Sequence, residues 1–159
     1  MPYKTDDERI KNLRPLISPA ILVEELPLVD ATANLVSTRR QEIGDIIHGS
    51  DDRLLVVVGP CSIHDPRAAL EYADKLKVAI DNFQDDLLIV MRVYFEKPRT
   101  TIGWKGLIND PDLNESYEIN KGLRTARKLL LDISNLGVPI GTEILDTIIP
   151  LFVADLISW

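Results

Sequence analysis

Four basic side chains are concentrated in one short stretch of an otherwise acidic sequence. Arginine pairs with carboxylate and phosphate groups through parallel N–H donors, so this stretch favours a site for an anionic, phosphorylated small molecule. The alternative is a solvated surface loop whose cations pair with acids elsewhere. That alternative leaves Arg92 unexplained, because an unpaired guanidinium at the end of an apolar run is costly to bury. The stretch, residues 92–105, contains the cations Arg92, Lys97, Arg99 and Lys105 and one acid, Glu96.

The single cysteine, Cys61, directly follows an apolar run and precedes His64 by three residues. Three roles are open to its thiol: a metal-ligating thiolate, a nucleophile activated by His64, or a small buried apolar side chain. A Cys-x-x-His pair does not decide among them, because a stable metal site needs three or four ligands. Glu143 follows another apolar run and is either a further polar group of the same site or a helix-capping or solvated acid.

Three short apolar runs, each followed by a loop and a capped amphipathic segment, predict parallel strands joined by crossover helices. Parallel strands bring their carboxyl ends to one edge of a sheet, so Cys61, the basic stretch and Glu143 should lie at the same edge. We expect strands at 54–58, 87–93 and 138–142, and helices from Asp65-Pro66 to about residue 80, over 119–133 with Gly137 as the stop, and from Pro150 to the C-terminus.

Residues 1–53 read as a helical arm that precedes the β/α units of residues 54–159. Ser18 and Pro19 suit the start of a first helix, which Pro27 ends. Asp30 is expected to cap a second helix that stops at Gly49.

Length and composition narrow the class of protein. A chain of 159 residues fits one domain or part of a larger one. The net charge of −7 disfavours nucleic acid as a partner, and apolar runs of about five residues predict no membrane segment. One cysteine and no apolar leader favour the cytoplasm. The repeated β/α unit predicts an α/β fold, either an open doubly wound sheet or the first three units of an eight-stranded barrel.

Three motifs resemble type I 3-deoxy-D-arabino-heptulosonate 7-phosphate (DAHP) synthase. They are GPCSIH at 59–64, RVYFEKPRTT at 92–101 and GWKGLINDP at 103–111. The likeness runs from about residue 6 to residue 159. The sister family that makes an octulosonate phosphate reads KANRS where this chain has KPRT at 97–100.

The resemblance implies the N-terminal part of a (β/α)8 TIM barrel and the first step of the shikimate pathway. In that step phosphoenolpyruvate condenses with erythrose 4-phosphate and phosphate is released, with the help of a divalent metal such as Mn, Fe, Co or Zn. By the same resemblance, Cys61 matches a metal ligand, Arg92 and Glu143 match contacts to phosphoenolpyruvate, and Lys97 lies between the two substrates as the catalytic lysine. Arg99 and Thr100 match the erythrose 4-phosphate site.

Feedback inhibition by an aromatic amino acid is also implied, in a homo-oligomer of two or four subunits. Asp6 and Asp7 resemble an N-terminal arm that helps close the inhibitor site of a neighbouring subunit, and Asp146 and Pro150 match the barrel side of that site. We expect phenylalanine as the effector, although residues 147, 151 and 152 depart from the family's common pattern there.

The remaining metal ligands and several basic residues of the family lie downstream of residue 159. We therefore expect the 159-residue chain, taken alone, to bind metal weakly and to lack synthase turnover. One alternative is a non-catalytic interaction module that binds full-length subunits through its arm and sheet edge. Another is a small open α/β domain with an anion site and no reaction.

Overall fold

The computed structural model describes residues 10, 13–97 and 102–159. The expectations for Asp6, Asp7, Arg99 and Thr100 fall outside these residues. In chain order the elements are α1 Pro19–Glu25, α2 Asp30–His48, β1 Leu54–Val58, α3 Pro66–Phe83, β2 Leu87–Arg92, α4 Ile119–Asn135, β3 Ile140–Gly141, α5 Pro150–Val153 and the 3-10 helix η1 Ala154–Leu156. Within these ranges no helix is both long enough and apolar enough to cross a membrane.

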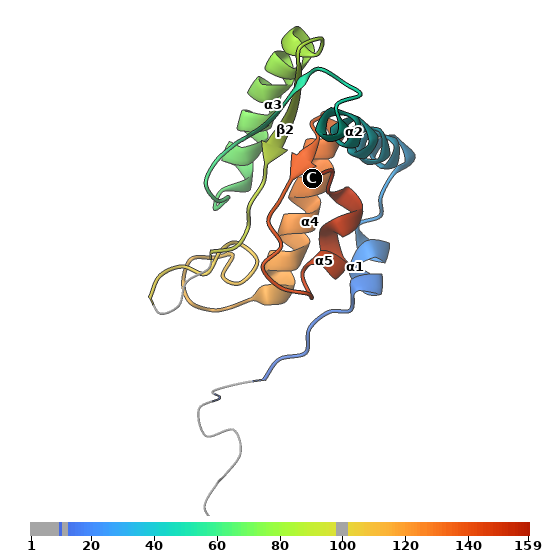
Figure 1. The fold of residues 1–159 in the computed structure, drawn as a ribbon. Coiled ribbons are helices and arrows are strands. Elements are labelled where there is room, and N and C mark those ends of the chain that lie inside the picture. Colours follow the sequence, from blue (N-terminus) through green and yellow to red (C-terminus); the bar gives the residue numbers. More distant parts are fainter. Residues whose placement is uncertain (1–9, 11–12, 98–101) are drawn as a thin grey trace, which may run out of the picture.

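The three strands form one parallel sheet in the order β1-β2-β3. β1 and β2 pair along their length, from Leu54 opposite Leu87 to Val58 opposite Met91. β3 pairs with the end of β2, where Arg92 lies opposite Gly141. This register places the carboxyl ends of the strands side by side, and helices connect the strands (Figure 1). The predicted α/β class is confirmed.

β2 is buried on both faces, as its continuous apolar run predicts. On one face Ile89 and Met91 join the main core, to which α3 and α4 contribute. On the other face Leu88 and Val90 pack with Ile43 of α2. β2 therefore lies between α2 and α3, as Figure 1 shows.

Most predicted helix ends are correct because their caps are local. The Ser18 hydroxyl accepts the Ile21 N–H, and the Asp65 carboxylate accepts the N–H groups of Arg67 and Ala68. Gly49 ends α2 with φ +78°. The prediction for Asp30 is wrong: Val29 is the N-cap, and Asp30 is the first helical residue, with no capping hydrogen bond from a side chain at this end.

The predicted final helix is also wrong beyond its first turns. Pro150 begins α5 as expected, but η1 ends at Leu156 and the backbone then becomes extended. Trp159 N–H donates to Ile140 O at 3.1 Å, and Thr142 N–H donates to Trp159 O at 3.0 Å. These bonds use free backbone groups on the outer edge of β3 and hold the last residues against that edge instead of in a helix.

The arm is bonded along one side of α4. Arg14 pairs with Glu118, and Ile17 N–H donates to the Asn120 side chain at 2.9 Å. Further along, Arg124 pairs with Glu25 across 2.7 Å. These polar contacts join the predicted N-terminal arm to α4, which belongs to the β/α units that follow it in the sequence.

Arg127 closes this contact at the end of α1. Its side chain is fully buried and donates to Leu26 O, to Phe152 O and to both oxygens of Asp155, over 2.7–2.8 Å. One guanidinium therefore joins the arm, α4 and the α5–η1 segment.

Candidate active site

β1 and β2 approach each other closely where both strands end. A Cβ added to Gly59 would lie 2.5 Å from Arg92 O, so only glycine fits between the two backbones. This close approach brings the residues after β1 next to those after β2. We call the group Cys61, Arg92 and Lys97 the strand-end site.

The Cys61 thiol is exposed, which excludes the buried apolar role. Lys97 Nζ lies 3.5 Å from Cys61 Sγ. This hydrogen bond and the lysine charge, with a smaller effect from Arg92, hold the pKa of the Cys61 thiol below its ordinary value. Lys97 therefore stabilises the thiolate, the form of the side chain that binds metals or attacks electrophiles. His64 is exposed on the same loop.

Arg92 lies against an aromatic ring. Its guanidinium carbon is 4.0 Å from the centre of the Tyr94 ring. The two side chains share one face of the extended chain, whereas Val93 points to the other and is buried. Stacking on the ring orients the planar guanidinium, which also lies close enough to Cys61 to lower the pKa of its thiol.

Lys97 is held by a short antiparallel pairing. Leu107 N–H donates to Phe95 O at 2.7 Å, Lys97 N–H donates to Lys105 O at 3.2 Å, and Glu96 is bridged to Gly106. Gly106 has φ +107°, and a Cβ there would lie 2.1 Å from Phe95 O. Residues 95–97 are therefore paired with residues 105–107 beside the strand-end site.

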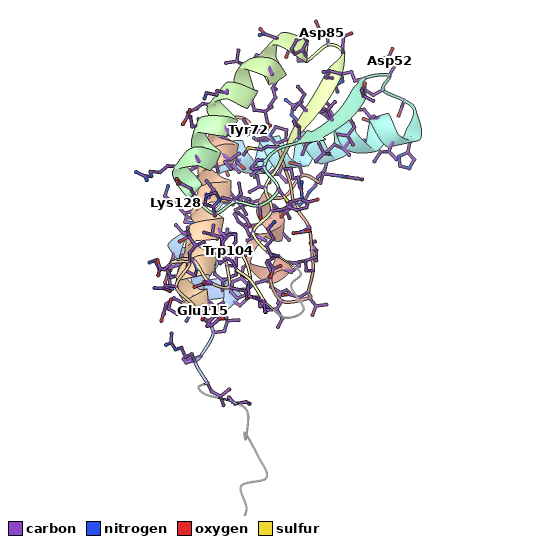
Figure 2. All side chains as sticks on the ribbon, turned by 90° about the vertical axis from the view of Figure 1, so that its left-hand side faces the viewer. Asp52, Tyr72, Asp85, Trp104, Glu115 and Lys128 are labelled. Atoms are coloured by element: carbon purple, nitrogen blue, oxygen red, sulfur yellow. The ribbon has the colours of Figure 1, made fainter. Side chains whose placement is uncertain are left out.

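Hydrogen bonds within the loop of residues 104–115 hold the segment that pairs with Lys97. Trp104 Nε1 donates to Asp110 O at 2.7 Å, and the Asp110 carboxylate accepts Glu115 N–H. Figure 2 shows Trp104 and Glu115 at one end of the molecule and Asp52 and Asp85, which precede β1 and β2, at the other. The loop thus lies at the carboxyl end of the sheet, where parallel α/β folds bind ligands.

Glu96 and Glu143 line a mostly apolar cavity of about 250 Å³ next to this loop. Burial raises the pKa of the Glu96 carboxyl, a hydrogen bond from Asn109 opposes the rise, and the charges of Asp146 and Glu143 add to it. The cavity is lined in addition by Thr142, Pro150 and Trp159.

Asp146 and Pro150 organise the turn that enters α5. Asp146 Oδ1 accepts the N–H groups of Ile148 and Ile149 at 2.7 and 2.8 Å. Pro150 occupies the first turn of α5. Both have a structural role in the chain itself, whatever they bind.

The structure thus brings Cys61, Arg92 and Lys97 together and places Glu143 beside Glu96. Sequence reasoning missed the roles of Tyr94 and Asn109. The two-residue spacing of Arg92 and Tyr94 in an extended segment could have indicated that their side chains stack. No pattern in the sequence indicates the contacts of Asn109. In the described part of the chain, no group of three or more His, Cys, Asp or Glu side chains is arranged to hold a metal ion.

Three β/α units place a thiol and cations at the carboxyl ends of their strands, which is where parallel α/β folds bind their ligands. Residues 28–159 match the model of the DAHP synthetase I family. The chain belongs to this family, and its transferase class follows from that membership.

Two named relatives illustrate the likeness. The phospho-2-dehydro-3-deoxyheptonate aldolase of Amycolatopsis methanolica is 61% identical over 154 residues, which are 97% of this chain and 76% of that protein. The Phe-sensitive enzyme of Escherichia coli K12 is 57% identical over all of this chain, but over only 45% of its own length.

The fold agrees with a solved structure. The phospho-2-dehydro-3-deoxyheptonate aldolase of Francisella tularensis SCHU S4 aligns with a TM-score of 0.92 and 59% identity, over 94% of this chain and 44% of that one. The three strands and their helices match part of the family's TIM barrel. The chain spans less than half the length of the E. coli and Francisella proteins.

Proposed function

We propose that this chain provides the phosphoenolpyruvate side of a DAHP synthase site. The observation that carries the proposal is the 3.5 Å approach of Lys97 Nζ to Cys61 Sγ at the strand ends, in a chain of this family. Arg92 and Lys97 would bind the carboxylate or phosphate of phosphoenolpyruvate, and Glu143 would reach it from the next strand. Arg99 and Thr100 are assigned to erythrose 4-phosphate by resemblance.

Each cation has a separate task in this proposal. Arg92, stacked on Tyr94, presents a rigid pair of donors that fixes the orientation of the anion. Lys97 neutralises charge as the enol carbon attacks the aldehyde of erythrose 4-phosphate, and it can donate a proton to the oxygen that becomes a hydroxyl. Water then adds to the cationic carbon that carries the phosphate group, and phosphate leaves.

A divalent metal belongs to the proposed reaction, and Cys61 fits one of its ligand positions because its thiol is exposed and its pKa is held below the ordinary value by Lys97. One thiolate does not fit a whole site, since stable sites have three or four protein ligands. We therefore derive no step through the metal and expect weak metal binding by these 159 residues.

Phosphoenolpyruvate binding tests the proposal on the chain as it is. Calorimetric titration should give measurable affinity that falls about tenfold in Arg92→Ala and in Lys97→Ala, the size expected for a lost charged hydrogen bond. Lys75→Ala, on the exposed face of α3, is the matched control and should bind like wild type. Equal affinity in all four proteins contradicts the proposal.

Turnover is a separate measurement. Phosphate release from phosphoenolpyruvate and erythrose 4-phosphate should be absent with this chain and present with the Phe-sensitive E. coli relative assayed beside it. Comparable turnover by the two proteins contradicts the argument that a single thiolate ligand is too little for a working metal site.

We also propose that an aromatic amino acid regulates the assembled enzyme at Asp146 and Pro150. The names of relatives support this: they include Phe-sensitive, Trp-sensitive and tyrosine-inhibited enzymes. Phenylalanine is our choice of effector. In an active enzyme that contains residues 146–150 of this chain, Asp146→Ala should weaken inhibition by phenylalanine. Unchanged inhibition contradicts the assignment of Asp146 to the effector site.

A further inference from the structure

Lys97 owes its place opposite Cys61 to a very short stretch of antiparallel pairing. Two backbone hydrogen bonds hold it, Leu107 N–H to Phe95 O and Lys97 N–H to Lys105 O. Isolated two-stranded pairings are marginally stable in water. A further contact is needed to keep the lysine side chain directed at the thiol.

The Asn109 side chain supplies that contact. Its Nδ2 lies 3.3 Å from Glu96 Oε1 and 3.3 Å from Lys105 O. One amide group therefore bonds to both segments of the pairing, to a side chain on one and to a carbonyl on the other. The same carbonyl accepts the Lys97 N–H.

Asn109 is itself anchored in the fold. Its neighbours Leu107 and Ile108 are fully buried, and Asp110 N–H donates to Gly106 O at 2.9 Å. A Cβ added to Gly122 of α4 would lie 2.0 Å from Ile108 O, so helix and loop are in direct backbone contact. The amide thus has little freedom to move relative to α4.

Glu96 and Lys97 are consecutive residues of this pairing. Glu96 is bridged to Gly106, and Lys97 N–H donates to Lys105 O. Holding the Glu96 carboxylate to Asn109 therefore restrains the backbone from which the Lys97 side chain reaches Cys61. The charges of Glu143 and Asp146 also act on Glu96, and both are acids that would repel its carboxylate.

We propose that Asn109 is a positioning residue that directs Lys97 toward Cys61 by tying the Glu96 carboxylate to the Lys105 carbonyl. The inference rests on the proposed function only in assigning Lys97 to the phosphoenolpyruvate site. Asn109 touches neither the thiol nor the proposed substrate, and it acts through the backbone of residues 96 and 97.

Two measurements on the purified chain test this role. Amide hydrogen exchange by NMR should be about fivefold faster at Lys97 and Leu107 in Asn109→Ala, as expected for a lost net hydrogen bond, with β2 and α4 amides unchanged. Phosphoenolpyruvate affinity, measured in the same samples, should fall severalfold. Glu96→Gln keeps the oxygen acceptor and should retain wild-type exchange and affinity. Asn34→Ala, on the exposed side of α2, is the control for replacing an asparagine.

Three results would overturn the inference: unchanged Lys97 exchange in Asn109→Ala, equally faster exchange throughout α4, or a loss in Glu96→Gln as large as in Asn109→Ala. The exchange data judge the Asn109 contact without any substrate. If wild-type chain binds no phosphoenolpyruvate, the proposed function fails, and the exchange data still decide the role of Asn109.

Discussion

Replacing Arg127 by methionine should destabilise the chain far more than the same replacement at Arg124. Both arginines lie on α4, and both pair through two nitrogens with an acid of another segment. They differ in burial: the Arg127 side chain is 0% exposed and that of Arg124 is 43% exposed. The comparison therefore isolates the effect of burial on one kind of ion pair.

The expected magnitudes follow from what each methionine would leave behind. Without Arg127, the carbonyls of Leu26 and Phe152 lose a donor, and a buried polar group left without a partner costs about 1–3 kcal/mol. The Asp155 carboxylate also loses its partner, but its side chain is 35% exposed and adds only about 0–1 kcal/mol. Arg124 and Glu25 are both exposed to water, and such pairs contribute about 0–1 kcal/mol. We expect a difference of at least about 2 kcal/mol in the free energy of unfolding.

Urea unfolding followed by far-ultraviolet circular dichroism measures both values. If Arg127→Met does not fold, Asp155→Asn provides a milder test, with an expected loss of about 1–2 kcal/mol because the Asp155 side chain is partly exposed. Equal losses in Arg127→Met and Arg124→Met, or no loss in Asp155→Asn, would refute the view that Arg127 holds the arm to the α5–η1 segment.

Three further predictions concern the site and its support. Burial raises the pKa of Glu96 above its ordinary 4.5, so the protonated side chain stabilises the fold below pH 4.5, and this stabilisation is lost as the pH rises through the folded-state pKa. Glu96→Gln should therefore be more stable than wild type near pH 7, and the difference in the free energy of unfolding should shrink toward about pH 4. An equal gain at every pH would contradict this prediction. Gly106→Ala should lose at least about 2 kcal/mol in thermal or urea unfolding, whereas Gly44→Ala, with open space around the new methyl group, should gain about 0.5–1 kcal/mol; similar values for the two would exclude the steric argument. Lys97→Met should raise the pKa of the Cys61 thiol and slow its alkylation at neutral pH, while Lys77→Met on α3 leaves the rate unchanged; a rate that does not respond to Lys97 would remove this lysine as the partner of the thiol.

The fold was largely predictable because its signals are local. Continuous apolar runs mark buried parallel strands, and Ser18, Gly49 and Asp65 mark helix ends through bonds to their own neighbours. The final helix was mispredicted because a distant partner, the edge of β3, competes for the backbone of residues 158–159. Such competition has no signature in the segment itself.

The site was predictable in its residue types but not in its contacts. Parallel strands explain why Cys61 and Lys97 meet, yet the exposure of the thiol could be known only from the fold. The Asn109 amide and the buried Arg127 act on carbonyls of segments that are distant in sequence or on opposite sides of a loop. Residue type alone gives no indication of such partners.

An experimental structure of this chain with phosphoenolpyruvate tests the central claim most directly. We predict that the carboxylate or phosphate of the ligand is bound by the Arg92 guanidinium and the Lys97 ammonium, on the side of the sheet where the Cys61 thiol is exposed. A ligand bound elsewhere, or a Lys97 side chain that lies away from Cys61, would contradict the account.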